Sequence, residues 1–417
     1  MYQQDAVCLQ PNRRNFTQAD DADDPTMRAT HCRSREPFPL TGACASIALC
    51  AGIAFSGTLP LWAQGPQQGM FPSPERLPTE APPGGQYVGG ATCIGCHPAE
   101  GKRQKSAPMA ITLQSAAQSE ILRTRLQLTF EIGPYTYQIL RKGNRSMYTV
   151  TDGRNTISEP IHWAFGLGNA GQTYVLQYRG SYWESRVSFY NEIQALDLTI
   201  GAPPTPPESL EKAVGREIKP AEARLCFGCH ATAAVGESGL QIEQLIPGVT
   251  CEGCHGPGGK HVAALQEGKP NEARTQVLNP GRFNTEGVSD FCGSCHRTWS
   301  QVMIAGVKGV SNVRFQPYRL TNSRCYDSAD NRISCLACHN PHEELRRDAA
   351  FYDSKCLACH LAKSRNKPRA QRVAAACRVG TKRCVTCHMP KYDLPGSHFK
   401  FSDHQIRVAR PNEPYPN

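Results

Sequence analysis

The sequence is poor in the residues that build a conventional hydrophobic core or a set of membrane spans. Hydrophobic residues make up only 39% of the 417 residues, and only one continuous apolar stretch occurs, near the N-terminus. Several membrane spans would need several apolar runs of about 20 residues, so that class is excluded. Disorder over the whole chain is also excluded, because aromatic residues reach 8% while charged residues stay at 20%. The residue in excess is cysteine, with 20 copies beside 13 histidines, although a chain this long needs no disulfides to fold.

Most of the cysteines belong to one repeated pattern, Cys-x-x-Cys-His. It occurs seven times, whereas chance would supply about 0.03 copies in a chain of this composition. We call the copies the first to seventh motifs in chain order. Their cysteines are Cys93 and Cys96, Cys226 and Cys229, Cys251 and Cys254, Cys292 and Cys295, Cys335 and Cys338, Cys356 and Cys359, and Cys384 and Cys387. Their histidines are His97, His230, His255, His296, His339, His360 and His388.

The spacing within each motif suits covalent attachment of a haem. Two thiols three positions apart can each add to one vinyl group of the same porphyrin, and the histidine that follows then binds the iron from one side. A structural zinc site is the first alternative, but it usually takes four protein ligands and each motif offers three. A thioredoxin-like redox pair is the second, but it occurs once, beside a βαβ unit. The sequence therefore predicts seven covalently bound haem c groups.

Covalent haem attachment implies export, and the apolar stretch Leu40 to Leu61 is predicted to be a signal peptide. Residues 1–63 are read as an N-terminal extension plus this signal peptide, with Met27 as the expected true start. The protein is then periplasmic, extracellular or on the cell surface. An uncleaved membrane anchor and a lipoprotein attached through Cys44 or Cys50 are the less favoured alternatives.

Two cysteines, Cys325 and Cys377, remain outside both the motifs and the predicted leader. In an oxidising compartment they would most simply form one disulfide, and two free thiols are the alternative. The leader holds five of the 46 basic and six of the 36 acidic residues, so the exported chain is more basic than the whole. We expect this excess to pair with haem propionates, because no run of Lys and Arg or basic helix indicates nucleic-acid binding.

The motifs are unevenly distributed, and this spacing predicts the organisation of the chain. Between the first two motifs, Leu126, Leu128, Phe130 and Ile132 alternate with polar residues before a turn at Gly133-Pro134, which predicts antiparallel hairpins. The expected segments are a Pro/Gly-rich linker (64–86), a first haem segment (87–125), a β-rich haem-free subdomain (126–207), a six-haem domain (208–410) and a tail (411–417). The predicted fold is therefore mainly short α-helices and irregular loops packed around haems, with a small antiparallel β-subdomain inserted after the first motif. The low hydrophobic content is expected because porphyrin faces supply apolar surface.

Each iron has a sixth coordination position, and the sequence offers few residues to fill it. The candidates outside the motifs are His162, His261, His342, His398, His404 and Met109. We expect about one of the five histidines to be a bystander, and Met109 is as well explained by packing. His342 and His261 follow the histidines of the fifth and third motifs too closely to reach the far face of the same haem, so we expect each to bind the iron of a neighbouring haem.

At these residues the chain resembles the multihaem cytochromes c. The stretch Ser334 to His342, together with Cys356 to His360, is similar to the doubled Cys-x-x-Cys-His motif of that family. The stretch Val249 to Gly258 with His261 is similar to a segment of the cytochrome c-554 type, where the later histidine is a distal ligand. The resemblance covers most of residues 87–410 and implies a heptahaem member of the family. No Cys-x-x-Cys-Lys motif occurs, which disfavours a resemblance to cytochrome c nitrite reductases. Haem number varies in the family, so a biological role does not transfer.

The expected function is electron transfer between redox partners, either other cytochromes or a quinol-linked membrane complex, with association at a membrane surface as one option and no chemistry on a substrate. The first alternative is a multihaem oxidoreductase that acts on a small nitrogen or sulfur compound at a five-coordinate haem. Arg314, Tyr318 or Arg319 would serve such a site, although contacts to propionates explain these residues better. The second alternative is a subunit of an extracellular cytochrome filament.

Overall fold

The computed structural model describes residues 79–360, 377–410 and 413–416. The predicted leader, its apolar stretch and Met27 therefore lie outside the described residues. In the part of the chain that the structure describes, no helix is both long and apolar enough to cross a membrane.

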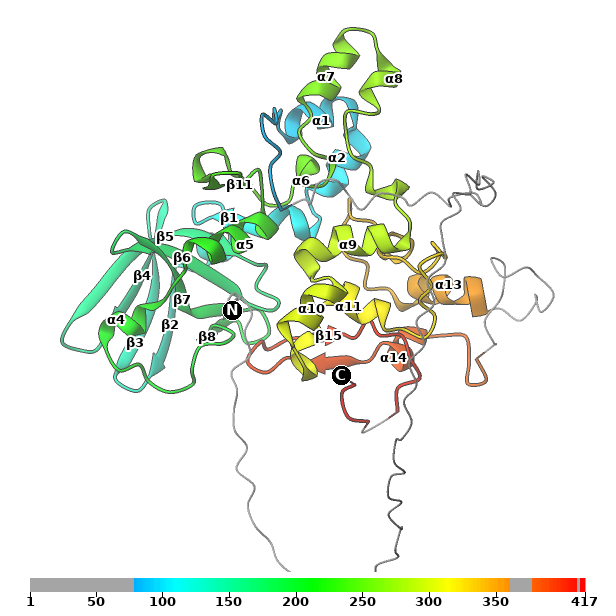
Figure 1. Ribbon diagram of the computed structural model, residues 1–417. Helices are drawn as coiled ribbons and strands as arrows, with labels where there is room; N and C mark the ends of the chain where they lie inside the picture. The colour runs from blue at the N-terminus through cyan, green and yellow to red at the C-terminus, as the bar shows by residue number, and fades with distance from the viewer. Residues whose placement is uncertain (1–78, 361–376, 411–412, 417) are drawn as a thin grey trace, which may run out of the picture. The chain divides into compact units, whose positions relative to one another are not determined.

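The largest regular element is an antiparallel sheet of nine strands, which Figure 1 shows with its strand labels. Seven strands lie side by side in chain order, from β2 to β8, while β1 pairs with β5 and β9 pairs with β7. The bounds are β1 Leu113–Ser115, β2 Gln127–Ile132, β3 Tyr135–Lys142, β4 Arg145–Thr151, β5 Thr156–Phe165, β6 Gln172–Tyr178, β7 Ser181–Tyr190, β8 Ala195–Leu198 and β9 Gly215–Glu217.

Alternation of apolar and polar residues explains the first strands. Leu128 pairs with Ile139 across β2 and β3, and Tyr137 pairs with Val150 across β3 and β4. The buried members of these strands form one cluster with Tyr148 and residues of later strands, because alternate side chains of a strand point to the same face. The sheet thus has its own hydrophobic core and does not depend on a haem for it.

The predicted fold class is wrong, because the β-region is a large sheet and not a small subdomain within a mainly helical protein. The alternating runs lie in strands as expected, but β1, β5, β8 and β9 were missed. β5 contains Glu159-Pro160 and a register shift between Ile161 and Trp163, and a proline inside a run normally argues against a strand. β1 and β9 have three residues each, too few to show a period.

Short helices carry the seven motifs. They are α1 Gly90–Cys96, α5 Pro220–His230, α6 Cys251–His255, α9 Thr285–His296, α12 Cys335–Cys338, α13 Ala349–His360 and α14 Cys384–His388. The other helices are α2 Pro98–Gln104, η2 Pro108–Ile111, α3 Glu120–Thr124, α4 Leu210–Val214, η3 Ile242–Gln244, α7 Gly259–Gln266, α8 Pro270–Ala273, η4 Pro280–Arg282, α10 Trp299–Ala305, η5 Gly309–Asn312 and α11 Gln316–Thr321. Three two-stranded sheets complete the fold: β10 Ala231–Thr232 with β13 Ile246–Pro247, β11 Val235–Gly236 with β12 Gly239–Leu240, and β14 Lys391–Asp393 with β15 Lys400–Ser402.

Buried apolar side chains are concentrated on the sheet and scarce around the later motifs. A second hydrophobic cluster joins the sheet to α5, where the ring of Phe165 meets Phe227 edge-on with 5.1 Å between centroids. Beyond residue 251, the described residues contain one further cluster, whose buried members are Val302, Phe315 and Tyr318. Five of the seven motifs therefore lie where side chains alone provide very little core.

Candidate haem c sites

Each motif places its two cysteines on one side of a helical turn. Cys226 is disulfide-bonded in this structure, and the other thirteen motif cysteines are thiols. In α6, for example, Cys251 and Cys254 are three positions apart and the helix ends at His255. Residues three apart are neighbours on a helix surface. α5, α9, α13 and α14 also end on the motif histidine, whereas in α1 and α12 it is the residue that follows the helix. One helical turn therefore orients two thiols and an imidazole toward the same volume, as attachment of a haem requires.

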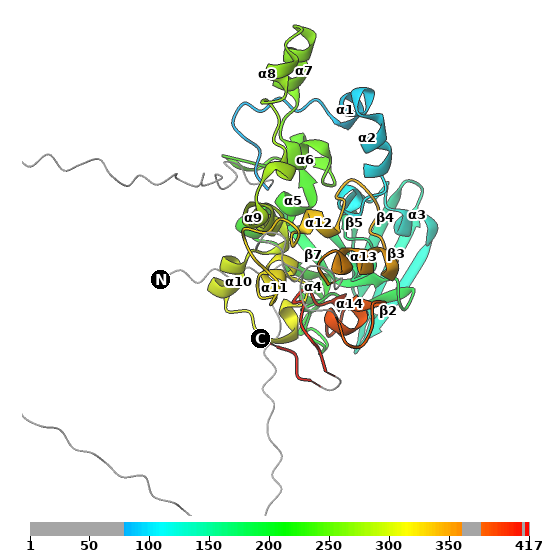
Figure 2. The ribbon, with the colours of Figure 1, turned by 90° about the vertical axis from the view of Figure 1, so that its right-hand side faces the viewer.

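Thiols of different motifs interact with one another across the fold. The interacting pairs are Cys93 with Cys251, Cys229 with Cys295, Cys292 with Cys335, and Cys356 with Cys384. Burial, followed by the Cys251 thiol, raises the pKa of Cys93 to about 11. The helices that carry these thiols contact each other in the same way: α1 touches α6, and α5, α9, α12, α13 and α14 form a continuous series, part of which Figure 2 shows.

One link in this series is made by a carboxylate inside the third motif. Glu252 is 2% exposed, and its Oε1 accepts hydrogen bonds from the backbone N–H groups of Val88 (2.9 Å) and Gly258 (2.8 Å). Its Oε2 accepts from the N–H of Gly89 (2.9 Å), the residue that caps α1. Glu252 therefore ties the start of the first motif helix to the third motif.

A second carboxylate links the sixth and seventh motifs in a similar way. Asp353 in α13 accepts hydrogen bonds from the backbone N–H groups of Arg383 (2.6 Å) and Cys384 (2.7 Å), at the start of α14. These two bonds lower the pKa of Asp353, because they favour its charged form.

Several histidines are oriented by hydrogen bonds that leave Nε2 free for iron. A carbonyl oxygen can only accept, so an Nδ1 that contacts one carries the proton and its ring presents the Nε2 lone pair. The motif histidines of this kind are His230, which donates to the carbonyl of Thr112 (3.2 Å), His255, which donates to that of Leu278 (2.7 Å), and His388, which donates to that of Arg407 (2.8 Å). The others are His261, which donates to Ala273 (2.8 Å), and His404, which donates to Ser402 (3.0 Å). Such an acceptor behind the ring is typical of histidines that bind a metal.

Two non-motif histidines lie opposite motif histidines. The rings of His342 and His255 are 5.9 Å apart between centroids and 4° from parallel. The rings of His404 and His339 are 6.2 Å apart with 41° between planes. Among the described residues, no group of three or more His, Cys, Asp or Glu side chains could hold a bare metal ion. The chain therefore offers imidazoles in pairs, which suits an iron whose other four ligands are porphyrin nitrogens.

Two of the predicted sixth ligands lie in other surroundings. His162 is exposed on β5. His398 places its Nε2 2.7 Å from Oδ2 of Asp197 in β8, and its ring meets Tyr190 edge-on at 4.9 Å. Nε2 of His398 is thus occupied by a carboxylate, and this contact attaches the C-terminal segment to the sheet.

Met109 lies in η2 with its side chain partly buried, and its carbonyl oxygen accepts a hydrogen bond from Val249 N–H (2.8 Å). That bond places Met109 beside Val249, just before the third motif, although Met109 follows the first motif in the sequence. The ring of His230 meets the ring of Phe165, with 5.2 Å between centroids.

The residues considered for a substrate site have structural contacts. Arg319 is fully buried, and its guanidinium makes a two-pronged ion pair with Asp403 at 2.8 and 3.0 Å. Tyr318 belongs to the small cluster around Phe315. The Arg314 guanidinium stacks on Phe315 at 5.6 Å, and burial lowers its pKa to about 10. The predicted disulfide does not form in this structure, where Cys325 and Cys377 are both free and exposed thiols.

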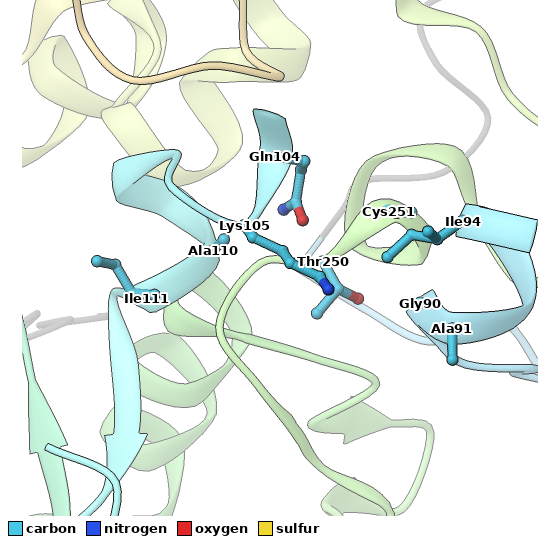
Figure 3. A pocket seen from close by; sticks show the side chains of 9 residues that line it. All are labelled: Gly90, Ala91, Ile94, Gln104, Lys105, Ala110, Ile111, Thr250 and Cys251. Atoms are coloured by element: carbon cyan, nitrogen blue, oxygen red, sulfur yellow. The ribbon is translucent and has the colours of Figure 1, made fainter. Parts of the chain in front are cut away.

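A pocket of about 370 Å³ opens between the first and third motifs (Figure 3). Ala91 and Ile94 of α1 line it on one side, and Thr250 and Cys251 line it on another. Lys105 adds an ammonium group to an otherwise largely apolar wall, which suits a flat apolar ring that carries carboxylates. Paired thiols, oriented imidazoles, a scarcity of apolar core and this pocket all fit haem c.

Sequence reasoning missed Glu252 and Asp353 as organising residues. The signal for Glu252 was present, because an acidic residue stands between the two cysteines of the third motif. Nothing in the sequence marks Asp353, whose partners Arg383 and Cys384 are distant along the chain.

Residues 204–256 match the family model described as cytochrome c554 and c-prime. No curated protein and no solved structure matches the chain. The matched stretch contains the second and third motifs, including α5 and α6. The match supports a c-type cytochrome with covalently bound haem c that takes part in electron transfer.

Proposed function

We propose that the chain is an exported c-type cytochrome with seven haem c groups, one at each motif, which carries electrons between redox partners. When bound, each haem supplies an iron that takes up and releases one electron. The observation that carries the proposal is the unbroken series of contacts between motif helices, α5 to α9 to α12 to α13 to α14, with α1 on α6. Electron transfer falls steeply with distance, so a carrier needs neighbouring cofactors and not merely many of them.

The chain's own residues would hold these cofactors in fixed positions. Glu252 and Asp353 each join two motifs through charge-assisted hydrogen bonds to backbone N–H groups, which are stronger than bonds between neutral groups. The carbonyls of Leu278 and Arg407 fix the rings of His255 and His388. A rigid support keeps the spacing between redox centres constant, and little reorganisation is then needed at each transfer.

Export and the partners are inferred from the sequence. Covalent haem attachment and the apolar stretch Leu40 to Leu61 support a periplasmic or extracellular location. The Pro/Gly-rich linker 64–86 would then stand at the start of the exported chain, and association with a membrane surface is one option. The partners that suit a soluble one-electron carrier are other cytochromes or a quinol-linked membrane complex.

A second candidate function is favoured by His398 and His162. His398 is bonded to Asp197 and His162 is exposed on the sheet, so three non-motif histidines remain for seven motifs: His261, His342 and His404. Irons without a second protein ligand could bind a small nitrogen or sulfur compound and reduce or oxidise it. The chain would then be a multihaem oxidoreductase.

Carbon monoxide separates the two candidates, because it binds reduced iron only where a coordination position is open. A pure electron carrier with all positions filled shows no spectral change with carbon monoxide in the reduced state. Carbon monoxide binding accompanied by turnover of a nitrogen or sulfur compound establishes the oxidoreductase. If neither reduced partner cytochromes nor a quinol analogue exchanges electrons with the haem-loaded protein, the proposed carrier function is wrong.

A further inference from the structure

Two pairs of histidine rings, His255 with His342 and His339 with His404, have the same composition. Each consists of one motif histidine and one non-motif histidine. In each pair, one ring is oriented by a backbone carbonyl: that of Leu278 for His255 and that of Ser402 for His404. Both Nδ1 atoms are thereby used up, and Nε2 is the only ring nitrogen of His255 and of His404 that can bind anything else.

The separations agree with two imidazoles on opposite sides of one iron. Two bonds of about 2 Å from imidazole nitrogen to a first-row metal, plus the distance from each nitrogen to its ring centre, place the centroids about 6 Å apart. The observed separations are 5.9 Å and 6.2 Å. Both separations also lie within the range of about 4.5–7 Å for aromatic pairs, so the carbonyl-bound Nδ1 atoms, and not the distance alone, point to a shared iron.

The positions of these residues in the fold also agree. His339 follows the last residue of α12, and His342 lies three residues further on. α12 contacts α9, and the Cys292 thiol of α9 interacts with both Cys335 of the fifth motif and Cys254 of the third. The third, fourth and fifth motifs therefore meet at one place. His404 lies just after β15. The Ser323 hydroxyl donates to the carbonyl oxygen of His404, and Arg319 of α11 binds the carboxylate of Asp403, so this segment is held against α11.

We propose that His342 is the second axial ligand of the haem at the third motif, opposite His255, and that His404 is the second axial ligand of the haem at the fifth motif, opposite His339. This inference rests on the proposed haem-loaded state. The segment 335–342 then holds two cofactors at once, by its own attachment site and by a ligand to the neighbouring haem. The haems of the third and fifth motifs would then be neighbours, because this segment would hold one of them and contribute a ligand to the other.

The test uses the full haem-loaded chain with His342→Ala, His404→Ala and both together. Each single variant is expected to convert one haem from low spin to high spin in the ferric state and to bind one more carbon monoxide per chain than the unaltered protein. The double variant is expected to bind two more. Added imidazole should restore the low-spin spectrum, and His342→Met should keep the iron six-coordinate while raising the potential of one haem, because a thioether ligand has that effect.

The matched control is Glu344→Gln, an exposed position two residues after His342, which is expected to change neither the spin state nor carbon monoxide binding. The pairing is overturned if the His342→Ala or His404→Ala chain keeps all seven haems, low-spin spectra and an unchanged carbon monoxide count. It is also overturned if the double variant opens only one haem, since both histidines would then serve the same iron. Failure of the proposed function gives a different result: the unaltered protein itself would lack seven covalent haems.

Discussion

Glu252 offers a sharp test of how the motifs are held together. Its carboxylate accepts three backbone hydrogen bonds while only 2% exposed. The substitution Glu252→Gln keeps the size of the side chain but replaces one oxygen by an NH₂ group. The amide oxygen can still accept from Val88 and Gly258, but the NH₂ group then faces the N–H of Gly89, and two donors cannot bond.

The expected loss can be estimated from these contacts. A hydrogen bond to a charged group contributes about 1.5–3 kcal/mol, and a buried donor without an acceptor costs about 1–3 kcal/mol. One bond is lost outright and two lose their charge, so we expect local stability to fall by about 3 kcal/mol. At about 1.4 kcal/mol per factor of ten, the contact between α1 and α6 should open about a hundredfold more often.

Amide hydrogen exchange read out by mass spectrometry measures this opening directly, because peptides that contain Val88, Gly89 and Gly258 report on the three donors. The matched control is Glu100→Gln in α2, where the carboxylate is exposed and lies 3.8 Å from Arg103, a contact expected to contribute little. Unchanged exchange at the three amides in Glu252→Gln, with the haems still bound, would refute the view that this carboxylate joins the first and third motifs.

Three further predictions follow from single contacts. Asp353 has a lowered pKa, so its contribution to the free energy of unfolding is fully present above the unfolded-state pKa of about 3.9 and is lost as pH falls below that value. The melting temperature of Asp353→Asn should therefore fall less steeply with decreasing pH than that of the unaltered protein. Arg319→Met removes the two-pronged ion pair to Asp403, which keeps Arg407 as its remaining partner at 2.7 Å, and should destabilise the protein by about 1.5–3 kcal/mol in denaturant unfolding. The control Lys400→Met removes the exposed pair with Asp393 and should change stability by less than about 1 kcal/mol. His162→Ala should leave the haem spectra unchanged, because that ring is exposed on β5; a new high-spin haem in this variant would show that the ring is an iron ligand.

Local chemistry could be predicted from the sequence, whereas long-range pairing could not. The seven motifs are visible because Cys-x-x-Cys-His spacing depends on one helical turn, and β2 and β3 are visible because their residues alternate around Gly133. The size of the sheet was underestimated because β5 contains Pro160, which argues against a strand in the sequence. In the structure Pro160 lies opposite Met147 of β4. Contacts such as Asp197 with His398 depend on how distant segments fold together, so His398 could not be told apart from the other histidines beforehand.

The pairing of His342 with His255 illustrates the same division. The short separation between His339 and His342 already indicates that His342 must serve a different haem. Which haem it serves depends on the contact of α12 with α9 and of the His342 ring with His255 at the end of α6, and no pattern within residues 335–342 encodes these contacts.

The most direct test of the central claim is the intact mass of the exported chain, combined with haem quantification as the pyridine haemochrome. The account predicts a polypeptide that starts after the leader and carries seven haems that stay bound under denaturing conditions. A chain with fewer covalent haems, or one that releases its haem when denatured, would contradict the assignment of every motif as an attachment site.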